Sequence, residues 1–299
     1  FMGLVGSEMC IRDRMSSTLY LLVGGEATRL KPLSEGIPKA LLTVKGTPII
    51  DLIINQLDPF LISKLKLICS IKHRDHWENY KQKSQFDIEL LFETEKLDTA
   101  GYMIKNIDEF EENFFCMNGD LLLNMNFEKF FNHVKNAPNT TICSVEVEDP
   151  SRFGVLFLKN EKVIDFIEKP SDTKYGNNIS MGFYYIAKKD ILRIKESLSI
   201  PTSFEKDVFP ALAKNLLLDC YKVEGTMIDV GTIESYIQAH TNGENNWIED
   251  NVTIGLNTKI ENSVIFESCS IGSDVHISNS IIQKEKNIPN GTKIINQIY

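Results

Sequence analysis

The sequence predicts an α/β domain followed by a short stack of repeated coils. From Met15 to about His240, short apolar segments alternate with amphipathic ones, which is the pattern of a layered α/β domain. A polar linker, Thr241–Asn246, ends this pattern, and an aliphatic repeat follows it. With 299 residues, the chain can bury one sizeable core and a smaller one. We expect one domain over residues 15–243 and a second over residues 247–299.

The first half of the larger domain is predicted to alternate strands and helices. Runs rich in Leu, Ile and Phe are short enough for buried strands, and amphipathic segments separate them. The expected strands are Leu19–Val23, Lys66–Ile71, Ile88–Phe92 and Phe114–Met117. The expected helices are Ile49–Leu61, His76–Gln85 and Ala100–Glu109. This alternation predicts a Rossmann-like half in an α/β/α arrangement.

The second half of this domain has strand candidates with few helices between them. These are Thr141–Val147, Phe153–Leu158, Val163–Ile167 and Ile179–Ile186. Such strands commonly pair antiparallel, so we expect a mixed sheet with an antiparallel insertion that forms one wall of a cleft. Helices are expected around Phe204–Lys214 and Ile233–His240.

The repeat after the linker has a period of 17 residues, as Ile254, Ile271 and Ile288 show. Each unit has three aliphatic positions, such as Ile254, Ile260 and Ile265. One inward side chain on each face of a triangular coil lets neighbouring coils stack into a continuous core. The repeat resembles the left-handed β-helix of hexapeptide-like repeats, with about three coils. A small sandwich of short strands is the alternative interpretation.

Composition argues against several classes of partner. The formal net charge is -9 and the sequence pI is about 5.2, whereas nucleic acids and anionic membranes select basic surfaces. An anionic substrate must therefore be met by local cations. The six cysteines show no Cys-x-x-Cys pairing, and most lie in apolar runs, which indicates buried thiols in a reducing cytoplasm. No apolar run approaches the roughly 20 residues of a membrane span.

The first residues differ in character from the rest of the chain. The segment from Gly6 to Arg14 lacks the charged leader and long apolar core of a secretory signal. It resembles the translated end of a sequencing adapter. We expect residues 1–14 to be a non-native leader, with Met15 as the natural start, and to be dispensable for folding and activity.

A glycine-containing loop follows the first predicted strand. Gly24 and Gly25 permit a tight turn and let backbone N–H groups approach a ligand, as a phosphate cradle requires. Arg29 and Lys39 add cations, and two prolines restrict the backbone, so we expect an ordered loop. The segment fits neither the P-loop nor the dinucleotide-binding pattern. Taken alone, it also fits an ordinary strand-to-helix turn.

Two aspartates are candidate ligands of a cation. Asp120 follows an apolar strand, and ligands of open α/β sheets gather beyond the carboxyl ends of the strands. Asp229 precedes a predicted helix. Each residue alone also fits a turn or a helix cap. Together, two carboxylates suit a hard cation such as Mg²⁺. His73 and His76 have no third ligand in sight and are interpreted as surface residues.

Taken in order, these motifs closely resemble the signature of the sugar-1-phosphate nucleotidyltransferases. The matching loop residues are Gly24, Gly25, Thr28, Arg29, Leu30, Pro32, Leu33, Pro38, Lys39, Leu41 and Leu42. Further matches are Asp120 and Asp229 in the family's Gly-Asp and Asp-x-Gly motifs, Glu168-Lys169-Pro170, Thr99-Ala100-Gly101, Gly154 and Gly182. The segment Ser203–Pro210 looks most like the mannose-1-phosphate and heptose-1-phosphate guanylyltransferase branches.

Two positions depart from the family pattern, which usually has glycine at both. Ala27 lies in the opening loop, and alanine tolerates a positive φ poorly, so we expect a slightly altered backbone or nucleotide affinity. Asp98 lies in the segment that lines the base and ribose, and it leaves the identity of the base open.

The resemblance implies a nucleotidyl transfer, in which a sugar 1-phosphate oxygen attacks the α-phosphorus of an NTP and pyrophosphate leaves. The nucleophile is already an anion, so the site has to position substrates and stabilise charge. The implied catalytic residues are Arg29, Lys39, Asp120, Lys169 and Asp229, with Asp120 and Asp229 holding Mg²⁺. The implied nucleotide contacts are Gly24, Gly25, Thr28, Thr99, Ala100 and Gly101. The implied sugar-phosphate contacts are Gly154, Glu168, Lys169 and Gly182.

The favoured substrates are GTP and mannose 1-phosphate or a related sugar phosphate, and the expected protein is a cytoplasmic homo-oligomer. One alternative is a glucose-1-phosphate uridylyl- or thymidylyltransferase. Another is a non-catalytic regulatory homologue whose coils mediate assembly. A hexapeptide acyltransferase that uses His276 as a base is a third alternative, but it leaves Arg29, Lys39, Asp120 and Asp229 unexplained.

Overall fold

The structure is a computed structural model that describes residues 17–57, 62–159, 162–171 and 175–299. The expected leader, residues 1–14, lies outside these ranges. The chain divides into two compact units. The first contains the residues up to Gly24, Ile54–Gly119 and Leu123–Met227, and the second contains Gly25–Ile53, Asp120–Leu122 and Ile228–Tyr299.

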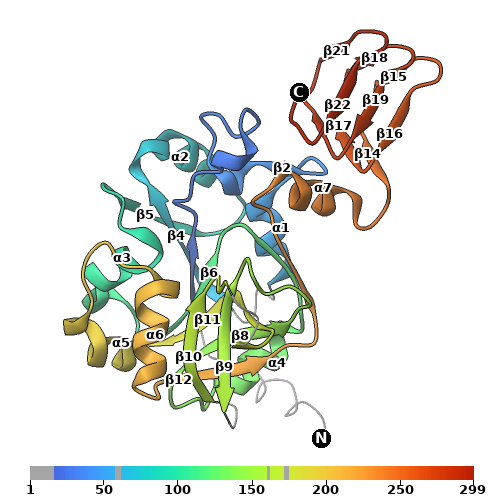
Figure 1. The fold of residues 1–299 in the computed structure, drawn as a ribbon. Coiled ribbons are helices and arrows are strands. Elements are labelled where there is room, and N and C mark those ends of the chain that lie inside the picture. Colours follow the sequence, from blue (N-terminus) through green and yellow to red (C-terminus); the bar gives the residue numbers. More distant parts are fainter. Residues whose placement is uncertain (1–16, 58–61, 160–161, 172–174) are drawn as a thin grey trace, which may run out of the picture. The chain divides into compact units, whose positions relative to one another are not determined.

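The first unit is built on a nine-stranded mixed sheet with the order β5-β4-β1-β6-β11-β8-β12-β10-β9 (Figure 1). Its parallel part consists of β1 (Ser17–Leu22), β4 (Ile62–Ser70), β5 (Ile88–Glu93) and β6 (Asn113–Asn118). These four strands confirm the predicted Rossmann-like half. Leu22 of β1 is in register with Ile68 of β4 and with Asn118 of β6, which aligns the carboxyl ends of the three strands.

The rest of this sheet confirms the predicted antiparallel insertion. It consists of β8 (Thr140–Glu146), β9 (Gly154–Lys159), β10 (Lys162–Glu168), β11 (Asn178–Ala187) and β12 (Leu218–Lys222). Strand β11 runs antiparallel to both β6 and β8, and β9 and β10 form an antiparallel pair. Strand β12, which the sequence analysis missed, lies parallel to β8.

Helices occupy both faces of this sheet. They are α2 (Arg74–Lys83), α3 (Asp98–Lys105), α4 (Phe127–Val134), α5 (Lys188–Ile194) and α6 (Phe209–Lys214). Helix α6 packs on β10 through the Phe166–Phe209 ring contact, whereas Phe130 of α4 contacts Phe115 and Phe183 of the sheet. The helix expected over Ile49–Leu61 is α1 (Ile49–Gln56), and residues 58–61 lie outside the described ranges.

The helix expected over Phe204–Lys214 is divided. Residues Phe204–Val208 form a π-helical turn, and only Phe209–Lys214 are α-helical. The Ser203 side chain caps the π-helical turn by accepting from the backbone N–H groups of Glu205 and Lys206.

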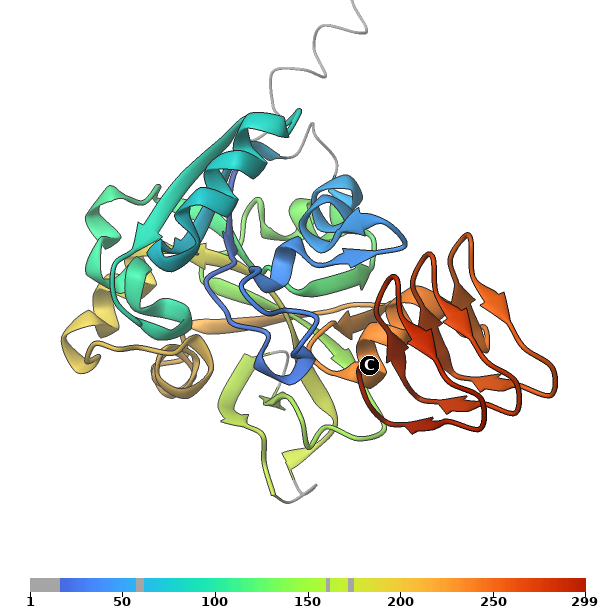
Figure 2. The same ribbon diagram turned by 90° about the horizontal axis from the view of Figure 1, so that it is seen from above.

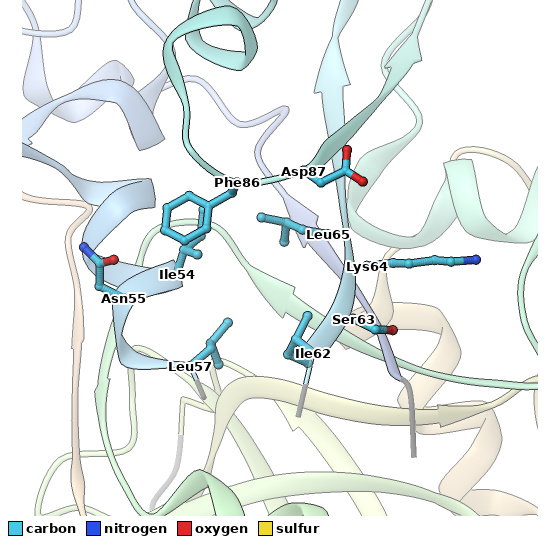
Figure 3. A pocket seen from close by; sticks show the side chains of 9 residues that line it. All are labelled: Ile54, Asn55, Leu57, Ile62, Ser63, Lys64, Leu65, Phe86 and Asp87. Carbon is cyan, nitrogen blue, oxygen red and sulfur yellow. The ribbon is translucent and has the colours of Figure 1, made fainter. Parts of the chain in front are cut away.

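A cavity of about 240 Å³ lies at the amino ends of β4 and β5 (Figure 3). Apolar side chains such as Ile54, Leu57 and Phe86 line it, while Lys64 and Asp87 point away from it. Ligands of open α/β sheets bind beyond the carboxyl ends of the strands. The cavity lies at the opposite edge and is therefore not a candidate for the reaction site.

In the second unit, the repeat forms a β-helix of three parallel sheets, as predicted (Figure 2). The sheets are β14 (Asn246–Ile248), β17 (Ser263–Ile265) and β20 (Ile281–Ile282); β15 (Thr253–Ile254), β18 (Ser270–Ile271) and β21 (Asn287–Ile288); and β16 (Lys259–Glu261), β19 (His276–Ser278) and β22 (Lys293–Ile295). Ile271 is in register with both Ile254 and Ile288, which confirms the 17-residue period.

The predicted inward aliphatics form the core of the β-helix. Six of them are at most 3% exposed: Ile265, Ile271, Ile277, Ile282, Ile288 and Ile294. Ile254 is 47% exposed because its coil is the first of the stack. The corners need left-handed backbone, and Asn257, Asp274 and Gly291 supply it at equivalent positions with φ of 60°, 59° and 71°.

The same unit contains the opening loop and helix α7 (Ile233–Thr241). The loop has two short 3₁₀ turns, Thr28–Leu30 and Lys39–Leu41, followed by the small hairpin of β2 (Thr43–Val44) and β3 (Thr47–Pro48). Tyr236 of α7 donates its hydroxyl to the carbonyl of Thr43 at 2.5 Å, which ties the helix to the hairpin.

The five cysteines in the described residues are all buried, as predicted: Cys69, Cys116, Cys143, Cys220 and Cys269. Among the described residues, no helix is both long and apolar enough to cross a membrane.

Candidate active site

Three predicted residues meet in the second unit. The Lys39 ammonium group forms an ion pair with Asp120, and its Nζ lies 3.3 Å from Asp229 Oδ1. The lysine side chain is 12% exposed, whereas the carboxylates of Asp120 and Asp229 are 31% and 40% exposed. Two aspartates that are far apart in the sequence therefore converge on one cationic centre.

Local backbone pairing brings the two aspartates together. Short strands β7 (Leu121–Asn124) and β13 (Thr226–Asp229) form a two-stranded sheet, and the N–H of Val230 donates to the carbonyl of Asp120 at 3.0 Å. Gly231 leaves room for the ion pairs, because a Cβ there would lie 2.9 Å from Asp229 Oδ1 and 3.1 Å from Lys39 Nζ. The glycine of the Asp-x-Gly motif thus has a steric function in this site.

The electrostatics of this cluster favour charged Lys39. Burial alone lowers the pKa of a lysine, but the nearby charges of Asp120 and Asp229 outweigh it, and the net pKa of Lys39 is raised. Lys39 therefore remains an ammonium ion at neutral pH.

The residues also fit a divalent metal ion. Both carboxylates reach the same cation, which is the arrangement that a hard ion with two protein ligands needs, the remaining ligands being phosphate oxygens and water. No cluster of three or more His, Cys, Asp or Glu side chains suited to a metal occurs in the described ranges. Asp120 and Asp229 are the residues whose carboxylates would hold it, because both reach the same point.

The opening loop is ordered by its own backbone. The carbonyl of Ala27 accepts from the Leu30 N–H at 3.0 Å and from the Ser34 hydroxyl at 2.6 Å. Gly25, Thr28 and Arg29 remain exposed. Ala27 has φ -80°, so the backbone penalty expected for alanine at this position does not arise.

In the first unit, the carboxyl ends of β1 and β5 bring Gly24 and Glu93 together. A Cβ at position 24 would lie 2.9 Å from Glu93 Oε2, so glycine is needed for this close approach. Burial, helped by the charge of Asp98, raises the pKa of Glu93 to about 7. Among the described residues, no donor is hydrogen-bonded to the Glu93 carboxylate. No motif in the sequence marks Glu93 as a site residue.

Asp98 begins α3 with a left-handed backbone, φ 65°. This explains why the related family has glycine there, and aspartate is among the residues that tolerate this conformation best. Its Oδ1 accepts from the N–H of Thr99 at 3.0 Å. The predicted contacts Thr99, Ala100 and Gly101 follow in the first turn of the helix.

A further group of predicted residues lies at the β9–β10 pair of the first unit. Gly154 is in register with Glu168, and a Cβ at position 154 would lie 3.1 Å from Glu168 Oε2. The Lys169 ammonium lies 2.8 Å from Glu168 Oε1. Gly182 of β11 adopts φ 68° and donates its N–H to the Ser180 hydroxyl. Lys169 is 58% exposed, so its charge is accessible to a ligand.

The predicted residues thus gather in three places. One group is Lys39, Asp120 and Asp229 in the second unit, which also contains the exposed loop residues Gly25, Thr28 and Arg29. The others are the Gly24 and α3 group and the Glu168 group, both in the first unit. Glu93 and Gly231 were not predicted from the sequence as individual residues. Only the last had a signal, as the glycine of the Asp-x-Gly motif.

Comparison with known proteins places the chain in a family. Residues 20–246 match the nucleotidyl transferase family, and residues 219–297 match the GlmU-like C-terminal hexapeptide family. The first match covers more than half of the chain. The chain belongs to the nucleotidyltransferase family. Together with the sheet and the β-helix, this membership confirms the predicted fold class.

Relatives of this nucleotidyltransferase include the mannose-1-phosphate guanyltransferase of Gibberella zeae, 31% identical over 230 residues. The mannose-1-phosphate guanylyltransferase catalytic subunit beta of Dictyostelium discoideum is 30% identical over 228 residues. These alignments cover 73% of the chain but 61% and 62% of the relatives, so the chain spans about three-fifths of their length. The predicted resemblance to sugar-1-phosphate nucleotidyltransferases is confirmed at the level of the family.

A solved structure shows the same fold. HddC from Yersinia pseudotuberculosis, in a complex with GMP-PN, is 26% identical to this nucleotidyltransferase with a TM-score of 0.62. The superposition covers 76% of the chain and 99% of HddC.

Proposed function

We propose that this nucleotidyltransferase joins the nucleotidyl group of GTP to mannose 1-phosphate or a related sugar 1-phosphate and releases pyrophosphate. The observation that carries the proposal is the convergence of Lys39, Asp120 and Asp229 on one centre. Cations and carboxylate ligands are what a reaction between two phosphate groups needs, because charge stabilisation and positioning dominate its catalysis.

The residues of the chain suggest a division of labour. Arg29 and Lys39 meet the β- and γ-phosphates and stabilise the departing pyrophosphate, with Gly24, Gly25 and Thr28 forming the cradle. Lys169 holds the phosphate group of the sugar 1-phosphate. An oxygen of that phosphate attacks the α-phosphorus of GTP in line. Glu168, Gly154 and Gly182 contact or border the sugar. Mg²⁺, held by Asp120 and Asp229, would neutralise phosphate charge when bound.

The preference for GTP is supported by the carboxylate of Glu93. Guanine presents two neighbouring donors on its pairing edge, N1–H and the N2 amino group, and one carboxylate accepts both. Uracil and thymine present one donor between two carbonyl oxygens, which a carboxylate repels. Glu93 lies between Gly24 and the start of α3, where the nucleotide is expected, and among the described residues it has no donor of its own. The names of the relatives agree with this preference.

We also propose a cytoplasmic homo-oligomer. The first coil leaves Ile254 and Leu256 47% and 80% exposed, which suits contact with another copy. A reducing compartment agrees with the buried free thiols. His276 does not support the acyltransferase alternative, because its Nε2 faces the carboxylate of Glu261 on the β-helix at 3.6 Å.

The decisive experiment is a matrix of four NTPs against mannose, glucose, glucosamine and heptose 1-phosphates, measured by pyrophosphate release. We expect GTP with mannose 1-phosphate or a related sugar phosphate to give the highest kcat/KM. Lys39→Ala and Asp229→Ala should each lower turnover by ~10² to 10³ while the protein stays folded. Lys259→Ala, on the exposed surface of the β-helix, is the matched control. Near-full activity of either site variant would contradict the proposed roles, and no pyrophosphate release with any pair would favour the regulatory alternative.

A further inference from the structure

In the first unit, the segment around Thr202–Glu205 is fastened to the start of α3. The N–H of Ala100 donates to the carbonyl of Thr202, and the N–H of Thr202 donates to the carbonyl of Leu97, both at 2.9 Å. A Cβ at Gly101 would lie 3.4 Å from the Thr202 nitrogen, which shows how closely the two backbones approach. Two segments about a hundred residues apart in the sequence therefore behave as one structural element.

The side chain of Glu205 completes this connection. Its Oε2 accepts from the Thr99 hydroxyl and from the Ser203 hydroxyl, each at 2.8 Å. The Thr99 oxygen in turn accepts from the N–H of Phe204 at 2.9 Å. Thr99 is thus held on both sides by the segment that carries Glu205.

Glu205 is not needed as the cap of its own helical turn. Ser203 already caps that turn through its hydroxyl, and Asp207 accepts from the Ser203 N–H at 2.7 Å. Besides its bond to Ser203, the carboxylate of Glu205 reaches beyond its own turn to Thr99, which belongs to another element. A π-helical turn is rare, and such turns occur frequently at functional sites.

The surroundings of Glu205 also place it beside predicted substrate contacts. Burial raises the pKa of Glu205, while the hydroxyls of Ser203 and Thr99 oppose the shift. The charge of Glu168, a predicted sugar contact, acts in the same direction as burial. Glu205 therefore lies near both the Thr99 segment and the Glu168 group of the same unit.

We propose that Glu205 is a positioning residue for the nucleotide, which holds the Thr99 hydroxyl and with it the first turn of α3. This inference rests on the proposed function, because Thr99 to Gly101 are expected to line the base and ribose. The start of α3 needs such support, since Asp98 adopts the unfavourable left-handed backbone. If the first turn of α3 is not held in place, nucleotide binding weakens. The rate of the chemical step is little affected, because other residues supply the reacting groups.

The test compares Glu205→Ala with Glu205→Gln. The amide oxygen of glutamine still accepts from Thr99, so Glu205→Gln should keep nucleotide affinity within about twofold. Glu205→Ala should raise the KM for GTP and the Kd for GTP without sugar phosphate about tenfold, with kcat and the KM for sugar phosphate within about twofold. Asp207→Ala is the control in the same segment, and it should lower thermal stability without changing the Kd for GTP.

Thr99→Val should reproduce the effect of Glu205→Ala, and the double variant should be no worse than either single one. An unchanged Kd for GTP in folded Glu205→Ala would overturn the inference. So would a Glu205→Gln variant as damaged as Glu205→Ala, because that result indicates a direct contact of the charged group with substrate. If the wild-type protein binds GTP but releases no pyrophosphate with any sugar phosphate, the proposed function fails, and the Kd values still test the inference. A wild-type protein that binds no nucleotide overturns both.

Discussion

Replacing Gly231 by alanine should damage the reaction while leaving the fold intact. The new Cβ would lie 2.9 Å from Asp229 Oδ1 and 3.1 Å from Lys39 Nζ, whereas ordinary contact begins at 3.4 Å, so the two groups must move by about 0.5 Å and 0.3 Å. Both atoms are at the ends of flexible side chains, so the fold can absorb the change. A misplacement of about 1 Å can cost ~10²-fold in rate, so we expect kcat/KM to fall about tenfold or more.

The stability of this variant should change by less than about 1 kcal/mol, because Gly231 has no left-handed backbone and alanine restricts the unfolded chain. Pyrophosphate release measures the first effect and thermal unfolding the second. Gly225→Ala is the contrasting variant, because its Cβ would lie 2.1 Å from the backbone oxygen of Asn124, which cannot move alone. The free energy of unfolding of this variant should be lower than that of the wild type by at least ~1–3 kcal/mol. Full activity of folded Gly231→Ala would refute the assignment of Lys39 and Asp229 to the reaction.

His240 is fully buried, and burial lowers its pKa to about 4 from 6.5. The folded state therefore binds fewer protons than the unfolded state at acidic pH. The free energy of unfolding should have its full value above pH 6.5 and fall by about 3 kcal/mol as the pH drops to 4. Urea unfolding at several pH values should show this fall in the wild type and a flatter profile in His240→Leu; equal profiles would contradict it. Ala27→Gly should not raise nucleotide affinity, since Ala27 is unstrained at φ -80°, and a large gain in titration calorimetry would show the opposite. In the absence of nucleotide, Lys39→Met should bind Mn²⁺ more tightly than the wild type does, because the ammonium group and the metal compete for the same carboxylates. Calorimetry that shows no gain in Mn²⁺ affinity would argue against that competition.

The sequence predicts the regular parts of this fold well, because the buried positions of strands and repeats are occupied by apolar residues in a recognisable pattern. The four parallel strands and the repeat follow from apolar runs and from aliphatics at a fixed period. Even the corners of the β-helix carry a signal, since Asn257, Asp274 and Gly291 are residue types that accept a left-handed backbone. Helix α4 was missed although Asn126 caps it and its phenylalanines form one buried face.

The missed parts depend on contacts between distant segments. Strands β7 and β13 are short and gain their pairing only from each other, so neither has a local signature. Asp120 and Asp229 resemble turn or cap residues until that pairing brings them to one lysine. The same holds for Glu205, because the proposed role of its carboxylate depends on a hydrogen bond that it accepts from Thr99, and the sequence pattern does not reveal this bond.

The two departures from the family's glycines have opposite physical consequences. Ala27 keeps a negative φ, whereas Asp98 adopts φ 65° at a cost of roughly 1–2 kcal/mol, which its bond to the Thr99 N–H partly offsets. The charge of Asp98 also helps burial to raise the pKa of Glu93 to about 7. If the Glu93 carboxylate accepts the donors of guanine, protonation removes that acceptor, so GTP should bind more weakly as the pH falls below about 7.

Asp98→Gly tests this coupling. Without the neighbouring charge, the pKa of Glu93 should decrease, and the loss of GTP affinity should shift to lower pH while glycine keeps the left-handed backbone without strain. The Kd for GTP, measured by calorimetry between pH 5.5 and 8.5, gives both profiles. Glu93→Gln is the control, because it has no charge to titrate and should remove this pH dependence. A wild-type Kd that does not change with pH, or an unshifted profile in Asp98→Gly, would show that Glu93 does not carry the recognition of the base.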